Sequence, residues 1–197
     1  SEMCIRDRAD LTVGLELMRA LTRLGRFDAA MDVYMGELAG ALIFNIHALD
    51  EMRALLSPFF PDGWKGETVV LPPLARGYLL NNAAIALDDA GTVESLRVRS
   101  LRVNLAEENV SNTVNSIRGL VGSAMSAGRL AESERLLATA LRLCEDEHDR
   151  RPTRLREFAL AVEMQRPDAM SLGEAVAAFE QTEDRNRFRK SVAAVWY

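Results

Sequence analysis

The sequence has few histidines and lacks the long apolar runs that form membrane spans. It contains two histidines, His47 and His148, far apart in the chain and without other ligands at metal-binding spacing. The acidic run at 145–149 could hold a divalent cation, but we favour a solvated helix end. No apolar run approaches the ~18 residues that cross a bilayer. We therefore predict no metal, no cofactor and no membrane contact.

Lysine is also scarce. The formal net charge is −5, and lysine accounts for two of the 24 basic residues, Lys65 and Lys190. A mildly acidic chain has no overall attraction to nucleic acid or anionic lipid. Two short arginine stripes, 97–102 and 185–189, lack the interleaved aromatic residues on which bases stack. We predict no nucleic-acid partner.

Catalytic motifs are missing as well. A phosphate-binding loop needs glycine before Lys-Ser/Thr, whereas Arg189 precedes Lys190-Ser191. The stretch VGSAM around Ser123 lacks the second glycine of a nucleophile elbow. Cys144 has no base beside it in the sequence. We therefore predict that the chain is not an enzyme.

The first eight residues, Ser-Glu-Met-Cys-Ile-Arg-Asp-Arg, resemble a translated adapter from short-read sequencing libraries. We exclude residues 1–8 as non-native and expect the remainder, from Ala9, to be a fragment. Cys4 lies in that stretch, which leaves Cys144 alone and excludes a disulfide framework. A reducing, cytoplasmic location is predicted.

The informative feature is self-similarity. Three related turns occur: LGRFDAA at Gly25, AGTVESL at Gly91 and AGRLAES at Gly128. The last two glycines lie 37 residues apart, and the first two lie 66 apart, close to twice a helical-hairpin period. Glycine adopts positive φ without strain, so we predict that each closes a helical hairpin.

The residues around these turns have helical spacing. Before each glycine, apolar or small residues recur at i, i+3, i+4 and i+7, which places them on one helix face. After the glycine, a small and a large residue follow four apart, so that two helices can interlock. The first-helix faces are Gly14, Leu17, Met18, Leu21; Leu80, Ala83, Ala84, Leu87; and Ile117, Leu120, Val121, Ala124. The pairs are Ala30 and Tyr34, Ser133 and Leu137, Ala175 and Phe179, with the order reversed in Leu96 and Ser100.

This period, the turn glycine and the small-then-large pair resemble the tetratricopeptide repeat. The resemblance implies an all-α, right-handed superhelical solenoid of antiparallel helix hairpins across residues 9–197. The expected units are 11–39, 41–60, 78–107, 113–146, 152–182 and a partial unit 184–197, with an irregular loop at 61–76. Another α-solenoid family stays an alternative, as does a strand at 69–71.

A closer likeness covers about 130 residues. The stretches LLSPFFPDGWKG, LLNNAAIALDDAG and AGRLAESERLLATALRLCED resemble the repeat region C-terminal to the ATPase in bacterial STAND-type signalling proteins. The resemblance implies a sensor or regulatory arm that binds protein, with an N-terminal ATPase module of the same chain as one partner. The alternatives are a freestanding adaptor that binds a peptide or protein, and a helical enzyme domain.

Four polar positions are candidates for protein binding. In tetratricopeptide arrays the first helix of each hairpin lines the groove, and the 37-residue offset aligns Tyr78 with Asn115 and Asn81 with Arg118. Amide and guanidinium groups hydrogen-bond peptide backbones and carboxylates. The alternative is that all four are ordinary helix-surface or inter-repeat residues. The missing lysines argue against the two-carboxylate clamp usual in that family.

Overall fold

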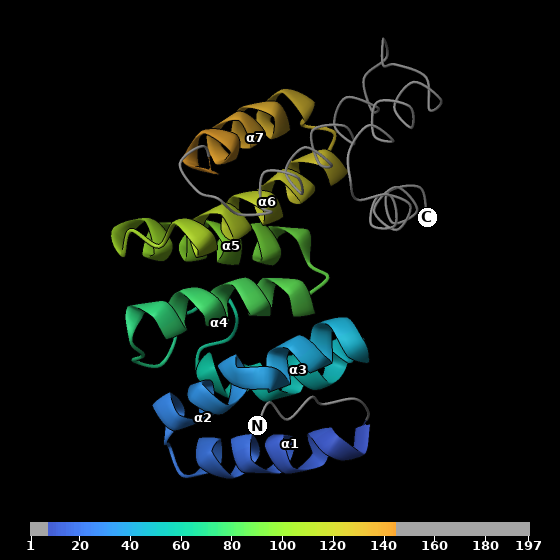
Figure 1. The fold of residues 1–197 in the computed structure, drawn as a ribbon, viewed down its shortest axis with the longest axis vertical. Coiled ribbons are helices and arrows are strands. Elements are labelled where there is room, and N and C mark those ends of the chain that lie inside the picture. Colours follow the sequence, from blue (N-terminus) through green and yellow to red (C-terminus); the bar gives the residue numbers. More distant parts are fainter. Residues whose placement is uncertain (1–7, 145–197) are drawn as a thin grey trace. The chain divides into compact units, whose positions relative to one another are not determined.

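The computed structural model of the chain describes residues 8–144, which form helices and connecting turns without any strand (Figure 1). The all-α prediction is confirmed for this range, and the strand alternative at 69–71 is wrong. The predicted units 152–182 and 184–197 lie outside the described residues. The chain divides into two compact units, one ending at Ser116 and one beginning at Ile117. The two units are described separately below.

The first unit contains five complete helices and the start of a sixth. They are α1 (Arg8–Arg23), α2 (Phe27–Val33), α3 (Leu49–Leu56), α4 (Pro73–Ala86), α5 (Ala90–Ala106) and the first part of α6 (Val110–Ser126). After α2 the chain continues through two π-helical turns, Tyr34–Leu38 and Ala41–Asn45, and a 3₁₀ turn, Ser57–Phe59, follows α3. The second unit holds the rest of α6 and α7 (Leu130–Cys144).

The turns at Gly25 and Gly128 are built in the same way. Gly25 has φ 70° and Gly128 has φ 71°. Each glycine N–H donates to the carbonyl three residues earlier, and the following arginine N–H donates to the carbonyl five residues earlier, with N–O distances of 2.8–3.0 Å. This is the Schellman pattern that ends a helix and starts the next. The predicted role of both glycines is confirmed.

The prediction for Gly91 is wrong. Gly91 is the second residue of α5, and the hairpin between α4 and α5 turns at residues 87–89. Asp89 caps α5 by accepting a hydrogen bond from the Thr92 amide at 2.8 Å and another from the Thr92 hydroxyl. These hydrogen bonds lower the pKa of the Asp89 carboxyl. A capping carboxylate therefore begins this helix, and no glycine is needed at the turn.

Glu108 closes the turn between α5 and α6 in place of a glycine. Its φ is 53°, and the Glu108 and Asn109 amides donate to the carbonyls of Leu105 and Asn104, three and five residues earlier. The same Schellman pattern thus occurs here with a residue for which the left-handed region is unfavourable. The two glycine turns and the glutamate turn therefore have the same backbone conformation.

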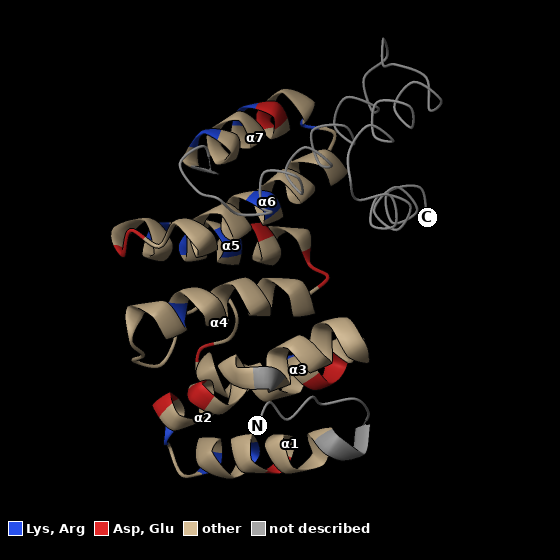
Figure 2. Ribbon diagram, viewed as in Figure 1, with Lys and Arg blue, Asp and Glu red and all other residues tan. Residues whose placement is uncertain are grey.

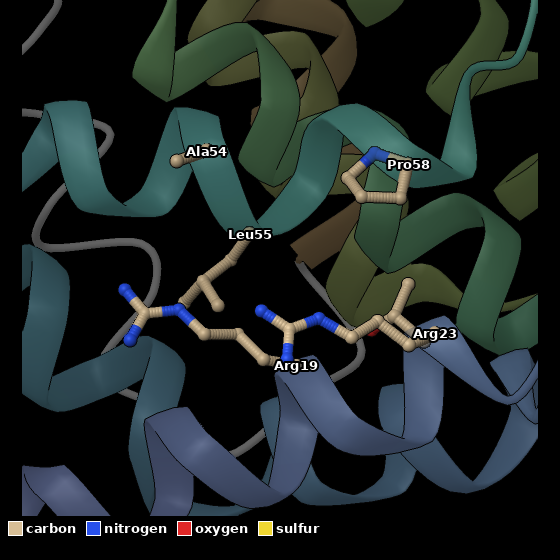
Figure 3. Close-up of a pocket in the computed structure, with 6 residues that line it drawn as sticks. Arg19, Arg23, Ala54, Leu55 and Pro58 are labelled. Atoms are coloured by element: carbon tan, nitrogen blue, oxygen red, sulfur yellow. The ribbon is translucent and has the colours of Figure 1, made fainter.

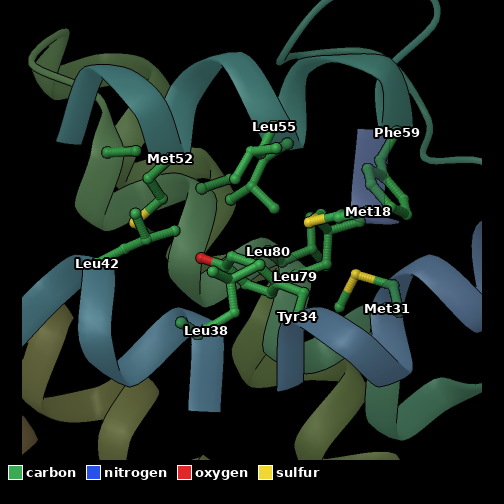
Figure 4. Close-up of a cluster of buried hydrophobic side chains, with 14 of the residues drawn as sticks. Met18, Met31, Tyr34, Leu38, Leu42, Met52, Leu55, Phe59, Leu79 and Leu80 are labelled. Atoms are coloured by element: carbon green, nitrogen blue, oxygen red, sulfur yellow. The ribbon is translucent and has the colours of Figure 1, made fainter. Parts of the chain in front are cut away.

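The hydrophobic core of the first unit lies between α1, α2, α3 and α4. Figure 4 shows Met18, Met31 and Met52 beside Tyr34 and Phe59, all fully buried. Methionine is unbranched and fills the irregular gaps between short helices. Leu17, predicted on the buried face of α1, is instead 47% exposed, whereas Leu11 and Met18 on that helix are fully buried.

The connection from Phe60 to Pro72 packs against the helices. The Phe60 and Trp64 rings lie 4.7 Å apart, and the Val69 amide donates to the Phe59 carbonyl at 2.9 Å. Leu71 is buried. The predicted irregular loop at 61–76 ends earlier than expected, because α4 begins at Pro73 and not at Tyr78. Proline suits the first turn of a helix, since that turn needs no N–H donor there.

Small residues bring α4, α5 and α6 together in the first unit. The Ser100 hydroxyl donates to the Gly77 carbonyl at 2.9 Å and lies 3.0 Å from the Ser116 hydroxyl. The Asn104 amide donates to both serine oxygens at 3.2 Å. Gly77, Ser100, Asn104 and Ser116 are all buried. We call these four residues the polar seam.

The seam predicts the outcome of a pair of glycine substitutions. A Cβ on Gly77 would lie 2.4 Å from Asn104 Oδ1, so Gly77→Ala is expected to lower the free energy of unfolding by about 1–3 kcal/mol. Gly122, inside α6, has no atom within 4 Å of the corresponding position. Gly122→Ala should therefore raise the free energy of unfolding by about 0.5–1 kcal/mol. Urea denaturation measures both, and equal effects would contradict the seam.

The turn geometry predicts opposite effects at residues 108 and 128. Glu108→Gly removes a left-handed backbone strain that costs an ordinary residue about 1–2 kcal/mol. The glycine also gives the unfolded chain more conformational freedom, which lowers the stability by about 0.4–1 kcal/mol. We expect a small net gain in unfolding free energy. Gly128→Ala should lower it, since its φ is 71°. Thermal melts compare the two variants, and a loss of stability in Glu108→Gly would refute the assigned turn.

Candidate functional site

The first two candidate residues, Tyr78 and Asn81, lie on α4, which is buried on most of its surface. Tyr78 is half-buried, and its ring meets the Tyr34 ring edge-on with centroids 6.2 Å apart. Asn82, the next residue after Asn81, is buried and donates from its amide to the Tyr78 carbonyl at 2.9 Å. Tyr78 is therefore partly committed to the interior of the first unit.

Asn82 links the two tyrosines. The Tyr34 hydroxyl donates to Asn82 Oδ1 at 3.4 Å, a long hydrogen bond. Burial raises the pKa of the fully buried Tyr34 phenol, and the neighbouring Tyr78 raises it further. Burial also raises the pKa of Tyr78, and a hydrogen bond to the Asn82 side chain lowers it by a smaller amount. Both phenols are thus held in the neutral form, which can donate but carries no charge.

Asn81 differs from Asn82 in its surroundings. Its side chain is half-buried and forms no hydrogen bond to another group within residues 8–144. The same holds for Asn115, on the part of α6 that belongs to the first unit. A partly exposed amide that has no partner within the described residues keeps its two donors and its carbonyl oxygen available there. These two asparagines are the candidates best suited to bind a ligand.

The structure brings two of the candidates to one junction. Tyr78 follows Gly77 and Asn115 precedes Ser116, and both of those small residues are bonded to Ser100 in the polar seam. The two residues that the 37-residue offset aligns, Tyr78 and Asn115, therefore both lie next to the polar seam. Arg118 lies on the part of α6 in the second unit, where it is half-buried and already has an interaction within the chain.

Sequence reasoning missed the arginines that contact other helices. Arg53 on α3 donates from Nε and Nη2 to the Ala86 carbonyl at 3.0 and 2.8 Å and pairs with Asp88 at 2.9 Å. It caps the end of α4 with a fork that matches the helix C-terminus. Arg19 and Arg23 on α1 line a cavity facing α3. Their four-residue spacing on one predicted helix could have indicated that both side chains lie on the same helix face.

The charges are spread over the helices, as Figure 2 shows. Within residues 8–144, no group of three His, Cys, Asp or Glu side chains could hold a metal ion. His47 is exposed with φ 49° at the turn before α3, so its backbone serves a turn. None of the helices in this range has both the length and the apolar character to cross a bilayer.

The comparisons with known proteins add no relative to this picture. No family model, curated protein or solved structure matches the chain.

The buried tyrosine predicts a pH dependence. The unfolded chain releases the Tyr34 proton near the ordinary pKa of 10.0, while the folded chain retains it. Stability should therefore fall as pH rises above about 10, because the unfolded state then binds fewer protons than the folded state. Tyr34→Phe removes this contribution, so the variant should lose less stability between pH 9 and 11.

Denaturant titrations at both pH values measure the difference. Equal losses in wild type and Tyr34→Phe would show that the Tyr34 phenol ionises freely in the folded chain.

Proposed function

We propose that the chain is a non-catalytic, protein-binding module of tetratricopeptide-like helical hairpins, arranged as a right-handed solenoid. The observation that carries the proposal is the recurrence of one Schellman turn at Gly25, Glu108 and Gly128. Repeat proteins reuse one supersecondary unit in this way, and they present extended surfaces to partners.

The packing of the second helices supports the same proposal. Ala30 and Tyr34 are both fully buried, as are Ser133 and Leu137 in the second unit. A small residue at the helix crossing and a large one a turn later are what interlocking hairpins require. Leu96 and Ser100 achieve the same burial with the sizes reversed.

Asn81 and Asn115 are the proposed contact residues. In the 37-residue sequence offset, Arg118 corresponds to Asn81 and Tyr78 corresponds to Asn115. Protein interfaces are held together by hydrogen bonds as well as apolar contact. Within residues 8–144 these two amides have no hydrogen-bond partner, so they can supply such bonds without breaking one inside that part of the chain. The partner we favour is a protein or peptide segment that presents backbone amides or a carboxylate.

The larger setting that we propose is the sensor arm of a bacterial STAND-type ATPase, in which partner binding at the repeats regulates the ATPase module. The nucleotide sequence upstream of codon 9 tests this setting. A P-loop strand–helix unit in the same reading frame would support it, and a start codon immediately upstream would favour the freestanding adaptor.

The contact residues are tested by substitution. Asn81→Ala and Asn115→Ala should each weaken capture of a partner by about 1–3 kcal/mol, since a partner group loses its hydrogen bond. Ser95→Ala, an exposed change on α5, is the matched control. All three should change stability by less than about 0.5 kcal/mol.

The measurement begins with a partner captured by the wild-type chain from the source cells, identified and then purified. Calorimetric titration of this partner against the three variants follows. Unchanged affinity in both asparagine variants would remove Asn81 and Asn115 from the contact. A lowered melting temperature would assign them to folding instead.

A further inference from the structure

A cavity of about 180 Å³ lies between α1 and α3 in the first unit. Arg19, Thr22 and Arg23 line it from α1, and Ala54, Leu55 and Pro58 line it from α3 and the 3₁₀ turn that follows. Figure 3 shows the two arginine side chains running along α1 beneath α3, with Leu55 above them. One wall is therefore cationic and the other apolar.

The two arginines differ in their partners. Arg19 is ion-paired with Glu51 on α3, which fixes its guanidinium beside the cavity. Arg23 has no carboxylate within ion-pairing distance among residues 8–144, and its guanidinium is directed into the cavity (Figure 3). Thr22 uses its hydroxyl proton internally, since it donates to the Met18 carbonyl. Together Arg19, Glu51 and Arg23 leave one positive charge for a ligand.

The opposite wall offers no polar side-chain group. Leu55 is 3% exposed, so its side chain is held in place by the core, and Ala54 and Pro58 extend this surface. An apolar cavity of about 150 Å³ is large enough for benzene. The cavity here thus has room for about seven or eight non-hydrogen atoms, well below the 300–1,000 Å³ typical of cofactor sites.

We propose that this cavity binds a monocarboxylate that carries a short branched aliphatic group, such as the C-terminal leucine of a polypeptide. The carboxylate pairs with the Arg23 guanidinium, which donates two parallel hydrogen bonds to planar oxygens. The aliphatic group packs on Leu55 and Pro58. A single negative charge matches Arg23, the one arginine of the lining that has no ion pair within residues 8–144. The apolar wall disfavours a strongly hydrated dianion such as phosphate.

The same chemistry could come from a free branched-chain acid or from a chain end. The chain end rests on the proposed protein-binding function, while the free acid does not. The cavity is open to solvent on α1, so the remainder of a polypeptide can leave it without being buried. The experiment therefore includes both sources.

The test uses the full chain labelled at leucine methyl groups and arginine Nε positions, followed by NMR. The probes are isovalerate, acetyl-Gly-Leu and its C-terminal amide, isovaleramide, acetate and inorganic phosphate. We expect saturable shifts at Leu55 and Arg23 with isovalerate and acetyl-Gly-Leu. Both amides and acetate should bind at least about tenfold more weakly. Equal binding of isovalerate and isovaleramide, or of isovalerate and phosphate, would overturn the proposal.

Three variants locate the binding. Arg23→Gln should weaken isovalerate binding at least about tenfold, and Arg26→Gln, an exposed arginine outside the lining, should leave it unchanged. Ala54→Leu fills the cavity from an exposed helix position and should abolish binding with both arginines intact. If Arg23→Gln fails to fold, Ala54→Leu still decides the question. Unchanged binding in Ala54→Leu would place the site elsewhere.

These outcomes separate the two proposals. Binding of isovalerate without acetyl-Gly-Leu would support a free-acid site and overturn the chain-end source. Absence of both would overturn the cavity proposal and leave the tests at Asn81 and Asn115 unaffected.

Discussion

The close approach of α4, α5 and α6 through the polar seam is the contact on which the first unit depends. Gly77 has no side chain, so Asn104 can occupy the space that a Cβ would fill. Ser100 then reaches both the α4 backbone and Ser116. Buried polar groups of this kind are costly unless they are satisfied, and here four small or amide residues satisfy one another. One added methyl group at residue 77 disturbs all of these bonds together.

The seam is joined to the core through α4. One side of this helix carries Gly77 to the seam, and Leu79 and Leu80 belong to the hydrophobic cluster with α1, α2 and α3. Arg53 fixes the C-terminal end of the same helix from α3. A helix held on two sides and at one end is a rigid support for the residues that remain exposed on it. Asn81 is partly exposed on this helix, so the binding that we propose there would need little reorganisation.

The cavity facing α3 has a different physical basis. The selectivity that we propose for it depends on Arg23, which has no carboxylate partner within residues 8–144, and on an apolar wall that includes the core residue Leu55. Arg19 and Arg23 have the same chemistry and lie one turn apart, yet Glu51 neutralises the first and leaves the second available. The position of Glu51 on another helix makes this distinction, and the spacing of the arginines alone cannot make it.

The sequence alone determined the helical class and two of the turns, because apolar spacing and glycine at positive φ act within a few residues. Gly25 and Gly128 were predicted on this basis, whereas Gly91 was misassigned because a capping aspartate ended the turn before it. Asn81 was indistinguishable from its buried neighbour Asn82, since one helix position decides which amide faces the core. Only the tertiary structure revealed the polar seam and the cavity, because each requires groups brought together from different helices. It also revealed the left-handed Glu108, because that backbone conformation is unfavourable for glutamate and its sequence does not indicate it.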